Sequence, residues 1–292
     1  MSKRIEFIIV FSLVQFFRFV PFPVLYLISR IAYIIAYYLW GYRKKTVFRN
    51  LQNSFPEKSP QEIESLTRQF YRNFCDVLAE TVKGLTMSES ALTKRFHVLN
   101  PTLLNDLYLQ HKSVISVGAH YGNSEWGKIL GKQLMHPMII IYSPFTNKYL
   151  NDYNNHKRIK FGMNLIPVAR TLRAFNEFKN NPHCFIMGVD QRPFDSQTAL
   201  WLTFLNQDTA CHKGYEQIAR KFNIPVIYSN IQRVKRGFYT LEYIMLCEEP
   251  SKTEEGFIVH QFMRTLEEMI RKKPENWLWS HERWKYKRTE KN

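Results

Sequence analysis

The stretch "SVISVGAHYGNSEWG" (113–127) joins a strand-like run to a helix-like run, and it carries a single histidine at the junction. Its first six residues are rich in β-branched side chains, as buried strands are. Asn123 or Ser124 can cap a helix that follows His120. The stretch therefore predicts a strand, a short loop and a helix in succession.

The same alternation continues along the rest of the chain. A helix is predicted to begin after Ser59, which can cap it, and to stop near Gly84. The strand-like runs are "SVISVG", "MIIIY", "NLIPV", "CFIMGVD", "IPVIYSNIQRV" and "YTLEYIML", and the later helical patterns lie at roughly 123–134, 147–161, 170–180, 212–223 and 254–272. Strands that alternate with helices predict an α/β fold, with a mixed, mostly parallel central sheet flanked by helices.

His120 lies where such a fold places its chemistry, at the end of a strand. Five residues along an ideal helix turn through about 500°, so His120 and Glu125 would point apart within one regular helix. They can meet if His120 lies in the loop and Glu125 in the first helical turn, and Gly118 and Gly122 supply the bend. A carboxylate on one ring nitrogen would fix the tautomer of an imidazole that takes a proton from a hydroxyl. We therefore take His120 as a candidate general base and Glu125 as its orienting partner, with an ordinary polar turn as the alternative.

Other catalytic chemistries have weaker support. The chain has no G-x-S-x-G elbow and no cysteine close to His120, which favours direct transfer over a covalent acyl-enzyme. No metal is expected, because H-E-x-x-H is absent and no second histidine ligand lies nearby. The cysteines are widely separated, so reduced thiols in a cytosol-facing protein are expected; they are Cys75, Cys184, Cys211 and Cys247.

The composition is globular and strongly basic. Hydrophobic residues make up 45% of the 292 residues, and the formal net charge is +16. Such a charge predicts an acidic partner: a nucleic acid, an anionic membrane surface, an acidic protein or a phosphorylated substrate. The charge alone does not distinguish among them.

An apolar run from Ile5 to Tyr42 precedes the body of the chain. It is too long for a signal peptide and lacks a clear small-residue cleavage site. Aromatic residues crowd its end and "RKK" (43–45) follows, as in a membrane segment whose next residues face the cytoplasm. We expect residues 1–45 to be a hydrophobic membrane-anchoring helical segment. Two prolines and Arg30 leave a span, a tilted or a re-entrant segment open, and a long buried core helix is the plain alternative.

Six blocks, in this order and spacing, carry a resemblance to a known family. They are "NLQNSFPEKSPQEIESLTRQFYRNF" (50–74), "GAHYGNSEWG" (118–127), "YSPFTN…HKRIKFGMNLIPV" (142–168), "GVDQRPFDS" (188–196), "FLNQDTACHKGYEQIARKFNIPVIY" (204–228) and "KKPENWLWSHERWK" (272–285). The chain resembles the bacterial lipid A biosynthesis acyltransferases, lauroyl and myristoyl, within the glycerolipid acyltransferase superfamily. The resemblance covers nearly the whole chain.

The resemblance implies a membrane-associated O-acyltransferase of lipopolysaccharide biosynthesis, with residues 46–292 as the acyltransferase domain. In this family the H-x4-D/E histidine is the general base and the acid orients it, which corresponds to His120 and Glu125. The acyl donor is usually the acidic acyl-acyl carrier protein, and the acceptor is a hydroxyl of a phosphorylated glycolipid at the cytoplasmic face of the inner membrane. No cofactor is expected beyond the phosphopantetheine of acyl carrier protein, or CoA, that carries the thioester.

The substrate-binding candidates are Arg158, Lys160 and Arg170, which could bind phosphate or an oxyanion, and Asp190 and Gln191 at the end of "CFIMGVD". The plain alternatives are a solvated basic face for the cations and a buried strand-end cap for the other two.

Two departures from the family pattern leave the acceptor open. The chain has Ser143 where the family has arginine, and Lys160 where it has a second arginine. Because lysine binds phosphate only as a point charge, another acceptor lipid or a secondary metabolite is an alternative. A basic nucleic-acid-binding protein and a non-catalytic membrane scaffold are the alternatives of a different class. The former lacks any recognised motif, and the latter predicts no contact between His120 and Glu125.

Overall fold

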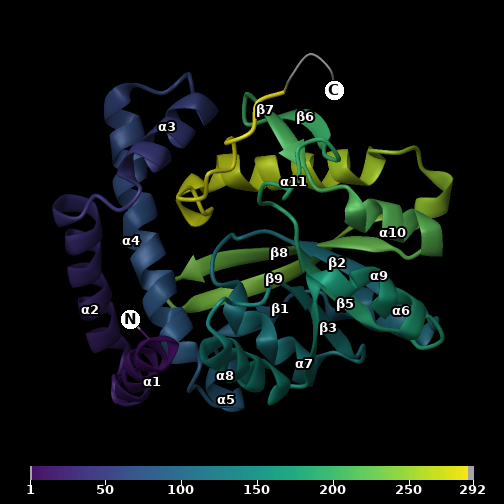
Figure 1. Cartoon of the computed structure of the whole chain (residues 1–292), viewed down its shortest axis with the longest axis horizontal. Coiled ribbons are helices and arrows are strands. Elements are labelled where there is room, and N and C mark those ends of the chain that lie inside the picture. Colours follow the sequence, from purple (N-terminus) through teal and green to yellow (C-terminus); the bar gives the residue numbers. More distant parts are fainter. Residues whose placement is uncertain (1, 289–292) are drawn as a thin grey trace.

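The computed structural model describes residues 2–288, and a seven-stranded sheet lies at the centre of the molecule (Figure 1). In sheet order its strands are β1 (Phe96–Val98), β9 (Phe238–Cys247), β8 (Val226–Lys235), β2 (Val114–Gly118), β5 (Cys184–Gly188), β3 (Met138–Tyr142) and β4 (Met163–Pro167). β8 and β9 pair antiparallel, and the other neighbours in this sheet run parallel. The predicted mixed, mostly parallel sheet flanked by helices is confirmed.

Helices cover both faces of this sheet (Figure 1). The described helices are α1 (Lys3–Phe19), α2 (Phe22–Ile34), α3 (Lys44–Ser54), α4 (Pro60–Gly84), α5 (Glu89–Thr93), α6 (Pro101–Leu109), α7 (Leu130–Gln133), α8 (Lys148–Ile159), α9 (Thr171–Glu177), α10 (Gly214–Phe222) and α11 (Phe257–Lys272). A π-helical turn (Ile35–Leu39) extends α2, and a 3₁₀ segment (Ser124–Ile129) precedes α7. A second, two-stranded sheet consists of β6 (Leu200–Phe204) and β7 (Gln207–Cys211), which the sequence did not predict.

Alternation along the strands builds one apolar layer on each face of the large sheet. In β2, Ile115 and Val117 belong to one layer, which includes residues of α4, α10 and α11. Val114 belongs to the other layer, together with Trp126 and Ile129 of the 3₁₀ segment. Residues after β2 contribute to both layers, Tyr121 to the first and Trp126 to the second.

Helix α4 begins where the sequence predicts. The hydroxyl of Ser59 accepts a hydrogen bond from the backbone N–H of Glu62, and the carboxylate of Glu62 accepts one from the N–H of Ser59. This reciprocal cap satisfies two amides that a helix start leaves unpaired. The 25-residue helix that follows packs against α2 and α3. It connects the N-terminal helices to the rest of the molecule.

The N-terminal helices bury one face and expose another. Leu25, Ser29 and Tyr33 of α2 are buried, and α2 lies alongside α4 (Figure 1). Many large apolar side chains of α1, α2 and the π-helical turn are exposed, among them Ile8, Ile9, Phe16, Leu27, Ile31, Ile34 and Leu39. Residues Phe22–Leu39 form one helix that is long and apolar enough to cross a membrane, and 22% of it is buried inside the protein. The division of the chain at residue 45 stays a prediction.

Two glycines allow α7 to approach the loop before β4 at backbone distance. A Cβ atom on Gly131 would lie 2.4 Å from the carbonyl oxygen of Phe161. Gly162, opposite it, has a φ of +83°, which residues with a Cβ rarely adopt. This contact holds α7 close to the loop that leads into β4.

We expect Gly131→Ala to lower the free energy of unfolding by about 1–3 kcal/mol, because a rigid backbone carbonyl must move to accommodate the added methyl group. Denaturant unfolding in detergent, followed by circular dichroism, measures this change. Gly214→Ala is the control, because a Cβ there meets no atom within 4 Å. Equal losses of stability in the two variants would contradict the expected clash.

Candidate active site

The loop that carries His120 is held by the C-terminal segment. The N–H of Gly122 donates to the carbonyl of Asn276 at 3.0 Å, and the carbonyl of His120 accepts from the N–H of Leu278 at 3.1 Å. Gly122 has a φ of +67°, which the loop needs in order to turn directly after this pairing. The backbone around His120 is thus fixed on one side by the C-terminal segment.

Asp190 forms the closest contact of the His120 ring. Nδ1 of His120 lies 2.7 Å from Oδ1 of Asp190, and the backbone N–H of His120 donates to Oδ2 at 3.0 Å. The indole N–H of Trp277 also donates to Oδ2, at 2.9 Å. Because an ionised carboxylate only accepts, Nδ1 carries the proton and Nε2 keeps its lone pair. Asp190 therefore holds the tautomer of His120 that can take a proton through Nε2.

Strand register explains this pairing. β2 and β5 are parallel neighbours, and Gly118 lies opposite Gly188. His120 and Asp190 each follow these glycines by two residues, so both emerge at the same edge of the sheet. Asp190 is only 2% exposed, whereas the side chain of His120 is 43% exposed. The carboxylate is thus enclosed and the imidazole is accessible.

The prediction that Glu125 forms a hydrogen bond with His120 is wrong. Glu125 instead accepts a hydrogen bond from Nη2 of Arg158 in α8 at 2.6 Å. The helix predicted after the loop begins as the 3₁₀ segment, which contains Glu125, and Nδ1 of the imidazole is already occupied by Asp190. A bond from a charged guanidinium also suits this carboxylate better than one from a neutral ring.

The two carboxylates nevertheless act together on the His120 pKa. Asp190 raises the pKa of His120 above the ordinary value by more than burial lowers it, and the charge of Glu125 adds a smaller increase. Burial would raise the pKa of Asp190, but the charge and hydrogen bonds of His120, together with the bond from Trp277, hold it below the ordinary value. The pair is therefore arranged to stabilise an imidazolium once His120 accepts a proton.

A cavity of about 840 Å³ lies beside His120. Alternate strand residues line it on one face of the sheet, and they include Ile140, Ile186, Ile231, Leu241 and Tyr243. The opposite face contributes Ile141, Met187, Val189, Tyr215 and Ile218. The cavity is thus largely apolar inside and reaches both layers, with His120 among its polar lining residues.

Three histidines line this cavity, but only one is made more basic. Burial lowers the pKa of His281 to about 4, and it also lowers the pKa of His212. The pKa of His120 is raised instead. Among the histidines of the cavity wall, His120 is therefore the one best suited to accept a proton.

The other predicted binding residues divide into two groups. Arg158, which is 14% exposed, and Gln191 both line the cavity. Lys160 and Arg170 are exposed and are not among its lining residues; Arg170 lies 3.8 Å from Glu177 instead. Asp190, predicted as a substrate-binding residue with a buried strand-end cap as the alternative, is buried and bonds the His120 ring instead.

Two residues with a direct part in the geometry of the site were missed from the sequence. Trp277 was read as a packing residue; it does pack, edge to face against Trp279, but its N–H also bonds Asp190. Lys128 lines the cavity with its Nζ bonded to the carbonyl of Gly84 at 2.6 Å, and burial lowers its pKa to about 8. No sequence pattern links Trp277 to Asp190, because the two residues lie 87 positions apart and only the fold brings them together.

This fold and site define a class of protein: an α/β enzyme with a histidine–aspartate pair beside an apolar cavity. Residues 2–286 match the family model of the bacterial lipid A biosynthesis acyltransferases, so the chain belongs to this family and is an acyltransferase. It is 24% identical to a lipid A biosynthesis palmitoleoyltransferase of Escherichia coli K12 and to a lipid A biosynthesis acyltransferase of Shigella flexneri. It is 21% identical to a lipid A biosynthesis lauroyltransferase of E. coli K12. Each match spans 91% of this chain and 86% of the relative.

We expect Asp190→Asn to lower the pKa of His120, because the substitution removes the main interaction that raises it. Glu125→Gln should lower it less. A histidine NMR titration in detergent measures both, with the His120 signal assigned from the spectrum of His120→Gln. An unchanged pKa in Asp190→Asn would contradict the pairing.

Proposed function

We propose that the chain transfers a fatty acyl chain from a thioester, carried by acyl carrier protein, to a hydroxyl of a lipid A precursor, with His120 as general base. The observation that carries this proposal is the His120–Asp190 pair at the apolar cavity. The printed names of the relatives support an acceptor of the lipid A type.

The proposed step is a direct transfer. Nε2 of His120 takes the proton of the acceptor hydroxyl while the hydroxyl oxygen attacks the thioester carbonyl. A C–O bond forms between this oxygen and the carbonyl carbon, and the carbonyl oxygen becomes an oxyanion. The oxyanion then re-forms the carbonyl of the new ester as the C–S bond breaks, and the leaving thiolate takes the proton from the imidazolium. Asp190 stabilises the imidazolium, and the guanidinium of Arg158, which lines the cavity, is a candidate to stabilise negative charge on oxygen.

Asp190 takes the orienting role that the sequence assigned to Glu125. The alternative hypothesis of a non-catalytic membrane scaffold predicted no contact between His120 and Glu125. His120 does pair with Asp190 and Glu125 with Arg158, as that hypothesis allows. Asp190 nevertheless supplies a carboxylate at hydrogen-bond distance, and the family is one of acyltransferases. Glu125 is proposed to hold Arg158 in place and to add to the basicity of His120.

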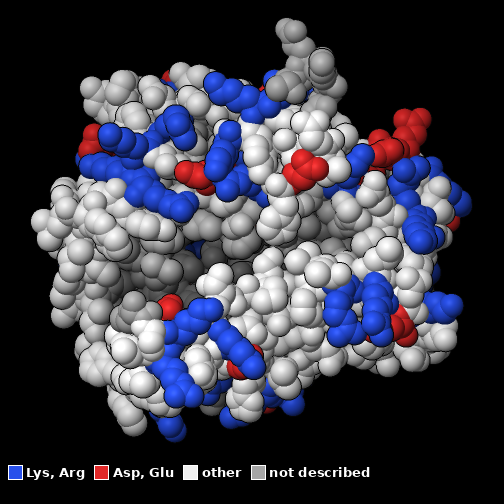
Figure 2. All heavy atoms as spheres, in the orientation of Figure 1, with Lys and Arg blue, Asp and Glu red and all other residues white. Residues whose placement is uncertain are grey.

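Charge supports an acidic donor and a phosphorylated acceptor. Figure 2 shows a hollow in one face of the molecule, with lysine and arginine side chains on both sides of it, over α3 and α8. Arg43, Lys44 and Lys45 lie at the start of α3, and Lys157 and Arg158 lie in the last turn of α8. Cations on both sides of a hollow attract anionic substrates from solution. Acyl carrier protein and the phosphates of lipid A are both negatively charged, so these cations would attract both.

The exposed apolar side chains of α1 and α2 support attachment to the inner membrane, with the acyltransferase domain on its cytoplasmic face. Because the inner face of α2 packs against α4, a segment that lies along the membrane surface needs no rearrangement of the protein. The cations at the start of α3 follow directly and would meet anionic headgroups.

An acceptor other than a lipid A precursor is the second candidate within the same chemistry. Ser143 lines the cavity where the family has arginine, so one phosphate-binding cation is missing. Offering both purified lipid A precursor and total phospholipid to the enzyme distinguishes these acceptors.

We expect His120→Ala to lower acyl transfer by at least about 100-fold, because the proton acceptor is lost. The assay supplies acyl-acyl carrier protein and lipid A precursor, and mass spectrometry detects a product heavier by one acyl group. His97→Ala, at an exposed histidine outside the cavity, is the control. Full activity in His120→Ala would exclude this residue as the base.

We expect Leu27→Lys together with Ile31→Lys to release a large part of the protein from anionic vesicles, because both side chains are exposed on α2 and lysine is costly in the bilayer interior. Vesicle flotation measures binding. Asn180→Lys together with Asn181→Lys adds the same charge at exposed positions outside the N-terminal helices, and this pair should not weaken binding. Retention of the double variant would contradict attachment through this face.

A further inference from the structure

A fully buried carboxylate lies outside the cavity, on α4. Glu80 is 0% exposed, and burial raises the pKa of its carboxyl despite the hydrogen bonds and the charge of Arg233, which favour the ionised form. Burying such a group is costly unless its partners satisfy it. The proposed transfer step does not use Glu80, so its burial calls for another explanation.

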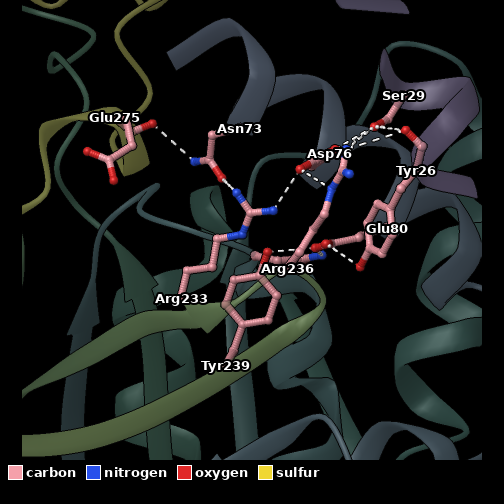
Figure 3. A network of polar contacts seen from close by, with 10 residues as sticks. Tyr26, Ser29, Asn73, Asp76, Glu80, Arg233, Arg236, Tyr239 and Glu275 are labelled. Carbon is pink, nitrogen blue, oxygen red and sulfur yellow. Dashed lines mark hydrogen bonds and ion pairs between the residues drawn. The ribbon is translucent and has the colours of Figure 1, made fainter. Parts of the chain in front are cut away.

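Glu80 joins three elements that are far apart in the sequence. Its carboxylate accepts from the hydroxyl of Tyr26 in α2 at 3.0 Å, from the hydroxyl of Tyr239 in β9 at 2.6 Å, and from Nδ2 of Asn123 at 3.4 Å. Figure 3 shows Tyr26 and Tyr239 approaching Glu80 from opposite sides. The third donor, Asn123, belongs to the loop that carries His120.

The same end of α4 holds the 3₁₀ segment that follows this loop at two further points. The indole N–H of Trp126 donates to the backbone carbonyl of Glu80 at 3.0 Å. One turn later, the carbonyl of Gly84 accepts from Nζ of Lys128. Asn123, Trp126 and Lys128 all follow His120 within eight residues. One side of the candidate catalytic loop therefore rests on α4, and the other side rests on the C-terminal segment.

We propose that Glu80 is a positioning residue for the acyl transfer, and that its bond to Asn123 holds the loop so that His120 meets Asp190. This inference rests on the proposed function. Glu80 touches no reacting atom; it acts through the loop backbone. Its loss should therefore disturb the His120–Asp190 contact without removing either partner.

Asp76 provides a matched control one turn earlier on the same helix. It is also buried, and it is bonded to Arg233, Arg236 and Ser29 (Figure 3). Among the hydrogen bonds and ion pairs of the described residues, none joins Asp76 to the loop of His120. Asp76→Asn therefore weakens the same polar network without touching the loop.

Tyr26 connects the Glu80–Asn123 bond to the N-terminal helices. Its hydroxyl bonds the carboxylate that holds Asn123, and α2, which carries it, is the segment with the apolar exposed face. Tyr26→Phe removes this one donor and keeps the ring that stacks under Arg236. We expect it to change the site in the same direction as the loss of Glu80, by a smaller amount.

The test compares Glu80→Gln with Asp76→Asn in the full-length protein at a temperature where both are folded. We expect Glu80→Gln to lower kcat about 10- to 100-fold with little change in the KM for acyl-acyl carrier protein, because orientation is lost while binding is kept. The His120 pKa, measured by NMR, should fall toward that of an ordinary histidine as the contact with Asp190 loosens. Asp76→Asn should leave the His120 pKa unchanged.

Each result decides between a positioning and a structural role. A folded Glu80→Gln with wild-type kcat and His120 pKa overturns the proposal, as do equal changes in Asp76→Asn. If Glu80→Gln does not fold, Asn123→Ala breaks the same bond from the loop side, and wild-type values in that variant overturn the proposal equally. The NMR measurement needs no substrate, so it remains decisive even if the protein transfers no acyl group and the proposed function fails.

Discussion

The register between β2 and β5 is the constraint on which the candidate site depends. Gly118 lies opposite Gly188, and two residues further along each strand the chain reaches His120 and Asp190. A shift of one residue would turn every side chain of a strand to the other face, so the imidazole and the carboxylate would no longer meet. The apolar layers on both faces of the sheet oppose such a shift, because it would take Ile115 and Val117 out of the layer in which they pack and turn them into the other one. The energy that fixes the fold thus also fixes the histidine–aspartate pair.

A buried carboxylate stabilises a site only if its remaining lone pairs are satisfied. Asp190 meets this condition because Trp277 and the backbone N–H of His120 both donate to its second oxygen. Trp277 lies in the C-terminal segment, whose backbone also pairs with the loop around His120. The last part of the described chain therefore completes a site that begins in β2. On the opposite side, α4 supports the same loop, so the loop is held between two elements that are both distant from it in sequence.

The sequence predicted the strands and helices well where the patterns were long, and it placed His120 correctly at a strand end. It missed the β6–β7 hairpin because the two turn residues, Leu205 and Asn206, both adopt positive φ without the glycine that usually marks such a turn. It also paired His120 with the wrong acid. A single sequence reveals acids that are close along the chain, such as Glu125, but Asp190 is seventy residues away and becomes a neighbour only through strand pairing. Both "GAH" and "GVD" were visible as strand ends; their order in the sheet was not.

The spacing between His120 and Glu125 still carries physical meaning. Glu125 lies near enough for its charge to raise the pKa of His120 without a hydrogen bond, and it holds Arg158 at the cavity wall. Asp190 controls both the tautomer and the basicity of the imidazole, whereas Glu125 affects basicity through space and places a cation. Two carboxylates with different tasks thus act on one ring. In this chain the histidine and the acid five residues apart therefore share a site, and the parallel strand next to β2 supplies the acid that forms the bond.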